Sequence, residues 1–282
     1  MSSKSRSRFI NYLLILAVVV LVAVWTAVFR GIEANPDISY PQIYFLNVGQ
    51  GDSALLSLPE STQVLFDAGR DSITVERIAE VMPFFDKRIE FAVISHFDSD
   101  HIGGLDEVML SYEIDKIIIA NAQKDQDKAR ELILEAEKND IEIKYVSKSD
   151  TIYFRAPVKG TVLWPEAGQE GLSDNDLSLV MHIEGAGKKV LMTGDIENKG
   201  QVYFFAKNKK EDLDTDILKF PHHGAGGAFN EKLFELTSPE KVIISVGKNS
   251  YGHPNRDLLD YLKNKMIEFA RTDEVGTIKE SL

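Results

Sequence analysis

Short apolar runs alternate with amphipathic stretches along most of the chain, and this pattern predicts the order of its elements. Runs that are rich in β-branched and aromatic residues predict strands over 43–48, 53–58, 63–66, 89–94, 116–120, 142–146, 160–163, 177–183, 189–192, 216–220, 241–246 and 269–272. Apolar positions spaced three and four apart predict helices over 73–81, 104–110, 124–137, 199–206, 230–236 and 256–266. Strands dominate the first third and alternate with helices afterwards, so we expect an α/β fold with two layers of sheet flanked by helices.

One stretch has no such alternation, because residues 9–29 are almost wholly apolar. A helix of that length spans ~30 Å, which is one hydrocarbon thickness. Three cations lie within residues 1–8, whereas Arg30 alone directly follows the stretch, so the N-terminus is expected in the cytoplasm. The sequence therefore predicts a cytoplasmic tail (1–8), a single-pass anchor in the cell membrane (9–29), a linker (30–41) and an extracytoplasmic domain (42–282).

A cleaved signal peptide is the alternative interpretation of the apolar stretch. Signal peptides have an apolar core of ~7–15 residues and a cleavage site made of small residues. Here the apolar core is longer, and residues 26–30 offer no good site. We therefore expect the anchor to be retained.

Composition narrows the chemistry of the domain. The chain has no cysteine, which excludes disulfide-linked partners, zinc–thiolate sites and a cysteine nucleophile. Beyond position 30 there are 28 basic and 44 acidic residues, because four of the 32 Lys and Arg residues precede that point, and the net charge is −16. Such a surface disfavours a polyanion unless bound cations offset the charge locally.

The densest group of ionisable residues is His96, Asp98, Asp100 and His101, which directly follows the apolar run 91–94. Imidazole together with carboxylate suits Zn²⁺, Mn²⁺ or Fe²⁺, and the four side chains are close enough to reach one or two cations. The alternative is a solvated acidic loop with incidental histidines. Because two of only six histidines fall within six residues, we favour metal binding.

The same arrangement recurs along the chain, because a potential ligand repeatedly follows an apolar strand beside Gly or Pro. Besides the cluster 96–101, this holds for Asp67, Asp195, the His222–His223 pair and His253. Sites of open α/β sheets form beyond the carboxyl ends of the strands. We therefore expect these side chains to converge on one cleft.

Several segments resemble a known family, the metallo-β-lactamase-fold hydrolases. Within it, the chain is similar to the extracellular hydrolase domain of ComEC-type DNA-internalisation competence proteins. The resemblance covers roughly 43–282 and rests on FLNVGQGDS (45–53), LFDAG (65–69), SHFDSDHIGG (95–104), NDLSLV (175–180), TGDIE (193–197), FPHHG (220–224), YGHP (251–254) and RTD (271–273).

The resemblance implies an αββα sandwich with two divalent metal ions, Zn²⁺ or Mn²⁺, on one edge. It assigns His96 and Asp98 to one metal and Asp100 and His101 to the other. Asp195 would bridge the two ions. A histidine from the pair His222 and His223, together with His253, would complete the site, and Asp67 would support the ligands from behind.

Three departures from the family pattern affect this assignment. Where a third histidine usually precedes the bridging Asp, this chain has Asn175 among polar residues. The Gly-Asp-Ser turn is intact, but Asn47 replaces an Asp before it. Ala225 and Ala228 replace serines after the paired histidines. The competence proteins also carry a multi-helix channel, whereas a single span is predicted here.

Four further residues are candidates for substrate contact or support. Asp52 and Ser53 lie in a Gly-rich turn, and the turn alone also explains them. Gly224 begins a loop whose backbone N–H groups could bind an anion, although a plain flexible loop is the alternative. Lys248 could neutralise a phosphate, although we favour simple solvation of this lysine at the surface.

These features predict a membrane-anchored, extracytoplasmic, metal-dependent hydrolase. We favour a phosphodiesterase that acts on nucleic acid, with single-stranded DNA one candidate, or on another phosphodiester, through a hydroxide held by two metals. Asp98, Asp100 and Asp195 are the expected catalytic residues. Hydrolysis of an ester, lactone or lactam, and a non-catalytic envelope module that binds metal or nucleic acid, are the alternatives. The sequence leaves open the metal, the choice between His222 and His223, and the oligomeric state.

Overall fold

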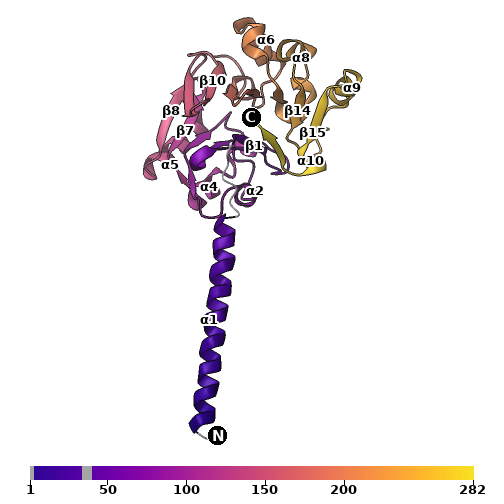
Figure 1. Cartoon of the computed structure of the whole chain (residues 1–282). Helices are drawn as coiled ribbons and strands as arrows, with labels where there is room; N and C mark the ends of the chain where they lie inside the picture. The colour runs from indigo at the N-terminus through magenta and orange to yellow at the C-terminus, as the bar shows by residue number, and fades with distance from the viewer. Residues whose placement is uncertain (1–2, 34–39) are drawn as a thin grey trace. The chain divides into compact units, whose positions relative to one another are not determined.

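The computed structural model describes the backbone of residues 3–33 and 40–282, and the surroundings of side chains 11–26 and 40–282. The chain divides into two compact units, residues 1–37 and 38–282 (Figure 1). The first unit contains α1 (Ser3–Glu33). Within the described residues, no helix combines the length and the apolarity needed to cross a membrane.

The predicted N-terminal segments fall partly outside this description. The tail 1–8 and the linker 30–41 include undescribed backbone, and the anchor 9–29 extends beyond the described side chains 11–26 at both ends. The anchor therefore stays a prediction.

In residues 40–282 the strands form two seven-stranded sheets. The first sheet has the order β16-β1-β2-β3-β5-β7-β8 and the second the order β15-β14-β13-β12-β11-β10-β9. The first consists of β1 (Gln42–Phe45), β2 (Ala54–Leu58), β3 (Thr62–Phe66), β5 (Phe91–Val93), β7 (Lys116–Ala120), β8 (Glu142–Val146) and β16 (Ile278–Ser281). The second consists of β9 (Thr151–Arg155), β10 (Val158–Trp164), β11 (Val180–Gly185), β12 (Lys188–Met192), β13 (Ile217–Lys219), β14 (Lys241–Ile244) and β15 (Glu268–Arg271).

The remaining elements are helices, 3-10 turns and one short ladder. The ladder pairs β4 (Arg88–Ile89) with β6 (Glu113–Ile114). The helices are α2 (Ile73–Val81), α3 (Ser99–Ile102), α4 (Leu105–Ser111), α5 (Asp127–Lys138), α6 (Asn198–Lys207), α7 (Lys210–Leu213), α8 (Glu231–Thr237), α9 (Arg256–Asn264) and α10 (Thr272–Val275). The 3-10 turns are η1 (Pro59–Ser61), η2 (Asn121–Gln123), η3 (Asn175–Leu177), η4 (His222–Gly224) and η5 (Gly226–Ala228).

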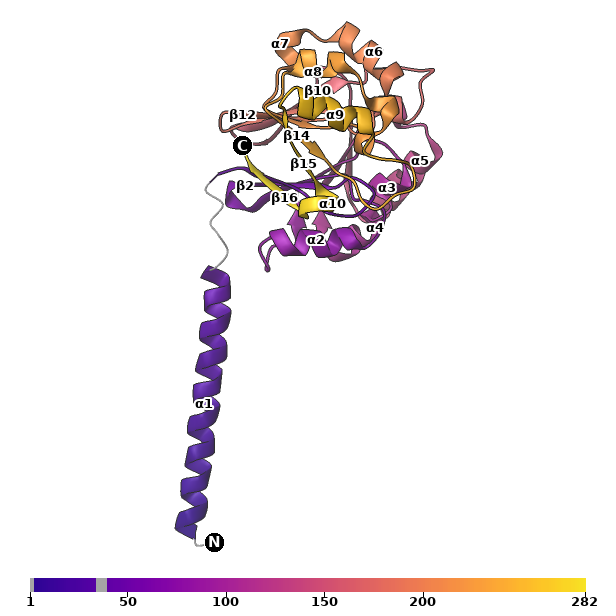
Figure 2. The same ribbon diagram turned by 90° about the vertical axis from the view of Figure 1, so that its right-hand side faces the viewer.

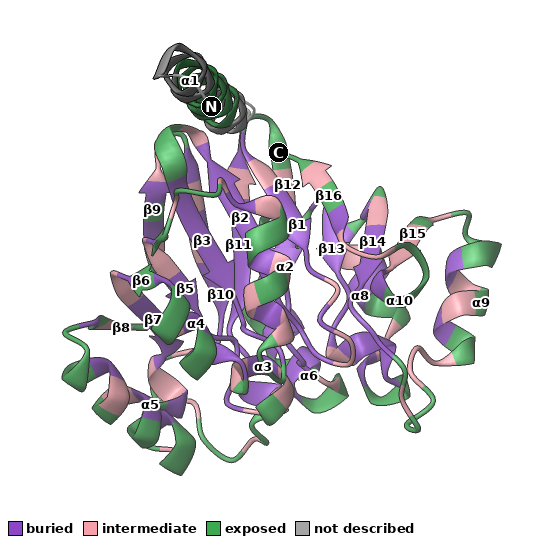
Figure 3. Cartoon of the chain, turned by 90° about the horizontal axis from the view of Figure 1, so that it is seen from below, coloured by how far each residue is buried: buried purple, intermediate pink, exposed green. Residues whose placement is uncertain are grey.

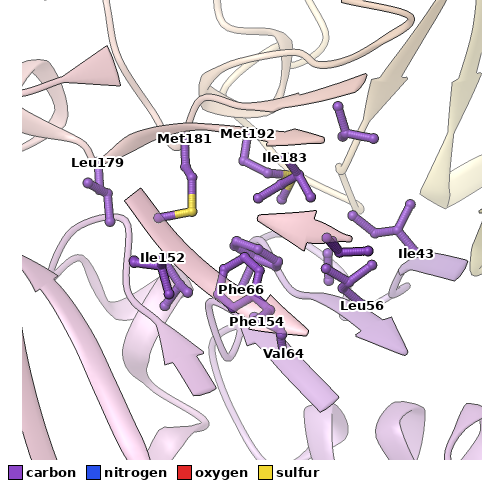
Figure 4. Close-up of a cluster of buried hydrophobic side chains, with 14 of the residues drawn as sticks. Ile43, Leu56, Val64, Phe66, Ile152, Phe154, Leu179, Met181, Ile183 and Met192 are labelled. Carbon is purple, nitrogen blue, oxygen red and sulfur yellow. The ribbon is translucent and has the colours of Figure 1, made fainter. Parts of the chain in front are cut away.

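Three apolar layers hold these elements together. Side chains of both sheets, such as Phe66 and Met181, pack face to face in the middle layer (Figure 4). A second layer buries Ile78 of α2 and Leu132 of α5 against the outer face of the first sheet. A third buries Phe204, among others, between the second sheet and helices α6 to α9, which lie on the opposite side of the sandwich from α2 (Figure 2). Seen from below, α2 and α4 lie across the first sheet (Figure 3). The predicted αββα sandwich is confirmed.

The direction of the strands creates one functional edge. Strands β3, β5, β7 and β8 run parallel in the first sheet, and β12, β13, β14 and β15 run parallel in the second. The carboxyl ends of parallel strands meet at one edge of each sheet. The loops that follow β3, β5, β12 and β13 therefore carry the side chains of the site.

Several short elements and one boundary differ from the prediction. The strand β6 and the one-turn helices α3, α7 and α10 were not predicted. β9 and β16 were not predicted; both lie at sheet edges, and β16 has polar residues between its ends. The strand predicted from residue 177 begins at Val180 instead, because η3 ends only at Leu177. Asp176 anchors η3: its carbonyl accepts a 2.8 Å hydrogen bond from the indole of Trp164, and its side chain accepts one of 2.8 Å from the N–H of Gly200.

Candidate metal centre

His101 and Asp195 lie at the middle of the site, where the two sheets meet. His101 lies in α3, beyond β5 of the first sheet, and Asp195 follows β12 of the second. The Nε2 atom of His101 is 3.2 Å from Oδ2 of Asp195, and both side chains are buried. The two motifs thus meet across the sandwich at a single point.

Asp67 holds His101 from behind. Its Oδ2 is 2.8 Å from Nδ1 of His101, and the N–H and hydroxyl of Ser95 donate to its carboxylate at 2.7 Å and 2.6 Å. A carboxylate at Nδ1 fixes the tautomer and directs Nε2 to the opposite side. Ser95, which the sequence did not single out, therefore contributes to the orientation of His101.

His223 approaches Asp195 from the other side. Its Nε2 lies 3.3 Å from Oδ2 of Asp100 and 3.6 Å from Oδ2 of Asp195. Its Nδ1 contacts the carbonyl of Ser245 at 3.0 Å and Oδ1 of Asp52 at 3.2 Å. With Nδ1 occupied by these partners, Nε2 of His223 faces the site.

Asp52 is part of a buried ion pair with Lys219, whose ammonium group also donates to the carbonyl of Phe220 at 3.1 Å. The structure thus places Asp52 behind His223. Sequence reasoning missed Lys219. The signal available was a single lysine in the otherwise apolar strand β13, because a cation that points into a sandwich needs a buried anion.

His96 and Asp98 occupy different depths. The side chain of His96 is fully buried, and its Nδ1 lies 3.0 Å from the hydroxyl of Ser95. The side chain of Asp98 is 45% exposed, with Oδ2 at 3.8 Å from Nε2 of His96 and Oδ1 at 3.9 Å from the ammonium of Lys128. His96 is therefore an inner residue, whereas Asp98 lies at the rim.

The rim also includes His222 and its neighbours. Its Nδ1 lies 2.9 Å from Oε1 of Glu197 and 3.4 Å from the amide nitrogen of Asn175, while its Nε2 is 3.7 Å from Oδ2 of Asp195. The ring of His253 lies beside it, with centroids 5.4 Å apart. Glu197 is a further contact that sequence reasoning missed, although the segment 193–197 was among those matched.

The adjacent histidines owe their different positions to an unusual backbone. His222 and His223 have φ angles of 49° and 53°, and Gly224 follows at 84°. Non-glycine residues in this region cost ~1–3 kcal/mol each and cluster at functional sites. A Cβ at Gly224 would lie 2.5 Å from Cβ of Pro254, so close packing also requires glycine there.

The remaining predicted residues stand further from the centre. The hydroxyl of Ser53 donates to the carbonyl of Asp67 at 3.0 Å and so supports the loop behind His101. Lys248 is exposed. The structure therefore brings together the inner residues His96, Asp100, His101, Asp195 and His223 with the supports Asp52 and Asp67. Asp98, Asn175, His222 and His253 surround them.

The inner residues fit a divalent metal ion. His96, His101 and Asp195 present ligand atoms within 4.8 Å of one another, and so do Asp100, His101 and His223. The Nε2 atoms of His96, His101 and His223 and Oδ1 of Asp195 are buried without a hydrogen-bond partner among the described residues. Buried polar atoms are rarely left unpaired. Their convergence therefore indicates cation ligands.

The pKa values of the buried residues also indicate a site for cations. Burial opposes the protonation of His223, but Asp195 and Asp52 outweigh it and raise its pKa to about 9. Burial likewise opposes the ionisation of Asp195, yet His101 and His223 hold its pKa well below the usual range. Burial lowers the pKa of His96 to about 3. Protons on His101 and His223 thus balance the buried carboxylates, as bound cations would.

The chain belongs to the metallo-beta-lactamase superfamily, whose family description matches residues 46–248. Among curated proteins it is similar to ComE operon protein 3 of Bacillus subtilis (28% identical over 84% of this chain) and to competence protein ComA of Neisseria gonorrhoeae (25% over 84%). The chain spans about a third of the length of these relatives, 32% and 31%. The resemblance to ComEC-type proteins is confirmed.

Solved structures of other proteins share the fold. Tm1679, a metal-dependent hydrolase of the beta-lactamase superfamily, matches 86% of this chain and 99% of its own with a TM-score of 0.54 at 13% identity. Zn²⁺-bound PqqB from Methylobacterium extorquens matches 85% of this chain and 100% of its own with a TM-score of 0.54 at 10% identity. At such identities the likeness concerns the fold alone.

Proposed function

We propose that residues 42–282 form a metal-dependent phosphodiesterase with two divalent cations. The observation that carries this proposal is the set of buried, unpartnered nitrogens of His96, His101 and His223 around Asp195. His96 and Asp98 would hold one ion, Asp100, His101 and His223 would hold the other, and Asp195 would touch both. His222, whose Nε2 lies 3.7 Å from Oδ2 of Asp195, would add a ligand from the rim. Membership of the superfamily supports hydrolysis as the reaction class.

The chain's own residues prepare the site for this reaction. Bound divalent ions supply Lewis acidity, which activates water and stabilises charge on a reacting phosphoryl oxygen. Asp67 and Ser245 fix the Nδ1 sides of His101 and His223, so that both rings present Nε2 inward. Asp52 contacts Nδ1 of His223, the side of the ring that faces away from the metal centre. Because Asp52 is paired with Lys219, the two residues together add no net charge to the site. The result is a rigid set of ligands that needs little reorganisation.

The rim defines where a substrate would lie. His222 and His253 are only partly buried, and Asn175 and Glu197 flank His222. The Asp98 carboxylate, 3.9 Å from the Lys128 ammonium, is also partly exposed at the rim. A phosphodiester would enter over this rim. The net charge of −16 beyond position 30 favours a small phosphodiester or the end of a single strand over long duplex DNA.

We further propose that the chain is anchored through residues 9–29, with the hydrolase domain outside the cytoplasm. The support is the apolar stretch behind the cations Lys4, Arg6 and Arg8. Protease added to intact cells should then remove the domain. Protection from protease, or a mature chain that begins near Gly31, would contradict this placement.

The activity is tested with the purified full chain in detergent, loaded with Mn²⁺ or Zn²⁺. We expect hydrolysis of bis-p-nitrophenyl phosphate and of single-stranded DNA, which is lost in Asp195→Asn and retained in Asp106→Asn, an exposed aspartate of α4. Hydrolysis of p-nitrophenyl acetate or a β-lactam in place of the phosphodiester would favour the carbonyl alternative. A folded, metal-loaded chain that cleaves none of them would be a binding module.

A further inference from the structure

Two large aromatic side chains project from the turn between α2 and β4. Phe84 and Phe85 are 75% and 60% exposed. The N–H of Asp86 donates to the carbonyl of Pro83 at 2.9 Å, so the two phenylalanines occupy the corners of a tight turn. Their rings contact each other edge to face, with centroids 5.0 Å apart. The fold itself leaves this apolar tip uncovered.

The base of the turn is firmly held. The carboxylate of Asp86 accepts hydrogen bonds from the side-chain amide of Gln63 at 3.1 Å and from the N–H of Arg88 at 3.2 Å. The Arg88 side chain pairs with Asp115 at 2.8 Å, and the Lys87 ammonium lies 5.0 Å from the centre of the Tyr112 ring. The turn therefore presents its aromatic tip in a defined position, with two cations behind the tip.

The turn lies at the edge of the sheet where the domain's chain begins. Gln42, the first residue of β1, is paired with Ser57, and Ser57 is paired with Gln63. The hydroxyl of Ser57 also donates to the side chain of Gln63 at 2.7 Å. Since neighbouring strands are ~4.8 Å apart, Gln63 and the turn bonded to it lie within roughly two strand widths of Gln42. The metal centre lies at the opposite end of the same strands, where Asp67 follows β3.

We propose that the Phe84–Phe85 turn docks onto the lipid bilayer and sets the orientation of the hydrolase domain on the membrane. This inference rests on the proposed anchor at 9–29. Twelve linker residues (30–41) span at most ~40 Å, so an anchored domain keeps Gln42 within that distance of the lipid surface and allows the turn to reach it. Segments that lie in the membrane interface typically combine exposed Phe, Trp or Leu with Lys or Arg beside them.

The bilayer is favoured over an acidic or a basic protein partner by the charges around the tip. Asp86 and Asp115 offset the charges of the exposed cations Lys87 and Arg88, so the base of the turn carries no net charge and only the tip, Phe84 and Phe85, is apolar. Neutral phosphatidylcholine should therefore suffice as the lipid, and anionic lipid should add little. With the turn in the interface, the metal centre at the opposite edge would face away from the lipid.

The cysteine-free chain allows a direct test. The full-length Phe84→Cys variant is labelled with an environment-sensitive nitrobenzoxadiazole dye and reconstituted into phosphatidylcholine vesicles. Leu134→Cys, a 58% exposed position on α5, is the matched control. We expect a blue shift of the Phe84→Cys label and its quenching by lipids with a shallow nitroxide, and neither effect for Leu134→Cys. Phe85→Cys gives a second, independent position if Phe84→Cys does not fold.

The outcomes separate the two proposals. If the full chain does not float with the vesicles, the anchor fails and the docking fails with it. If the chain floats but the labels at both positions stay unquenched, the docking alone is wrong and the anchor stands. A blue shift that depends on protein concentration without quenching by lipid would assign the tip to a protein contact and overturn the lipid proposal.

Discussion

Nε2 of His101 lies 3.2 Å from Oδ2 of Asp195, although the two residues extend from different sheets of the sandwich. His223 reaches the same carboxylate oxygen at 3.6 Å and His222 at 3.7 Å. One carboxylate thus faces three imidazoles from both halves of the fold. This arrangement suits a bridging anion and makes Asp195 the residue on which the metal centre depends.

Asp195→Asn should abolish metal-dependent hydrolysis while the chain stays folded. The amide keeps the size of the side chain but removes the negative charge that would separate two cations in a dry site. We expect a loss of at least one bound ion and an unchanged circular dichroism spectrum. Turnover like that of the wild type at low micromolar metal would show that Asp195 is not the bridge.

Metal binding should release protons and weaken as the pH falls. The pKa of His223 is raised to about 9, so near neutral pH its proton must leave before Nε2 can bind a cation. Each proton displaced should lower the apparent affinity about tenfold per pH unit below that value. Titration calorimetry in buffers of different ionisation enthalpy measures the release. Affinity that does not vary between pH 6 and 9 would contradict it.

The same histidine should make the metal-free chain sensitive to alkali. A pKa that is higher in the folded chain than the usual 6.5 stabilises the fold fully below pH 6.5. That contribution is lost as the pH rises through about 9. We expect the urea midpoint of the metal-free chain to fall over this range, and His223→Gln to fall less.

Lys219→Met should destabilise the domain by up to about 3–5 kcal/mol, because the buried carboxylate of Asp52 would lose its ammonium partner and keep only His223. Combining it with Asp52→Asn removes that charge and should restore much of the loss. Urea denaturation of both variants gives the comparison. Equal stability of Lys219→Met and the wild type would show that the pair is dispensable.

Glu197→Ala should weaken binding of the ion nearest His222 by ~10–100-fold, which is typical for loss of a carboxylate behind a ligating histidine. Glu197→Gln retains an acceptor for the Nδ1 proton and should be milder. Metal titration of the two variants distinguishes orientation from charge. If Gln and Ala behave alike, the negative charge of Glu197 matters more than its hydrogen bond.

The sequence predicted most of the helices and strands, because amphipathic spacing and apolar runs follow from which residues are buried. The amphipathic stretch 256–266 became α9, for example, and the apolar run 116–120 became β7. β16 escaped prediction because an edge strand pairs its backbone on one side only and tolerates polar residues. Its pairing with β1 joins the two ends of the domain, which no local pattern reveals.

The sequence predicted the ligand residues that directly follow strands. It did not predict the residues that hold these ligands in place, because those residues are distant from one another in the sequence. Lys219 and Asp52 are separated by 167 positions, and nothing local marks them as partners. Spacing also could not separate His222 from His223, because they are adjacent. Burial distinguishes them: the side chain of His223 is 1% exposed and that of His222 is 24% exposed.

The most direct test of the metal centre is the number of divalent ions bound by the purified full chain, counted by native mass spectrometry after equilibration with Mn²⁺ or Zn²⁺. We expect two ions in the wild type and in Asp106→Asn, and at most one in Asp195→Asn. A folded wild-type chain that binds one ion or none under these conditions would contradict a two-metal hydrolase and favour a binding module instead.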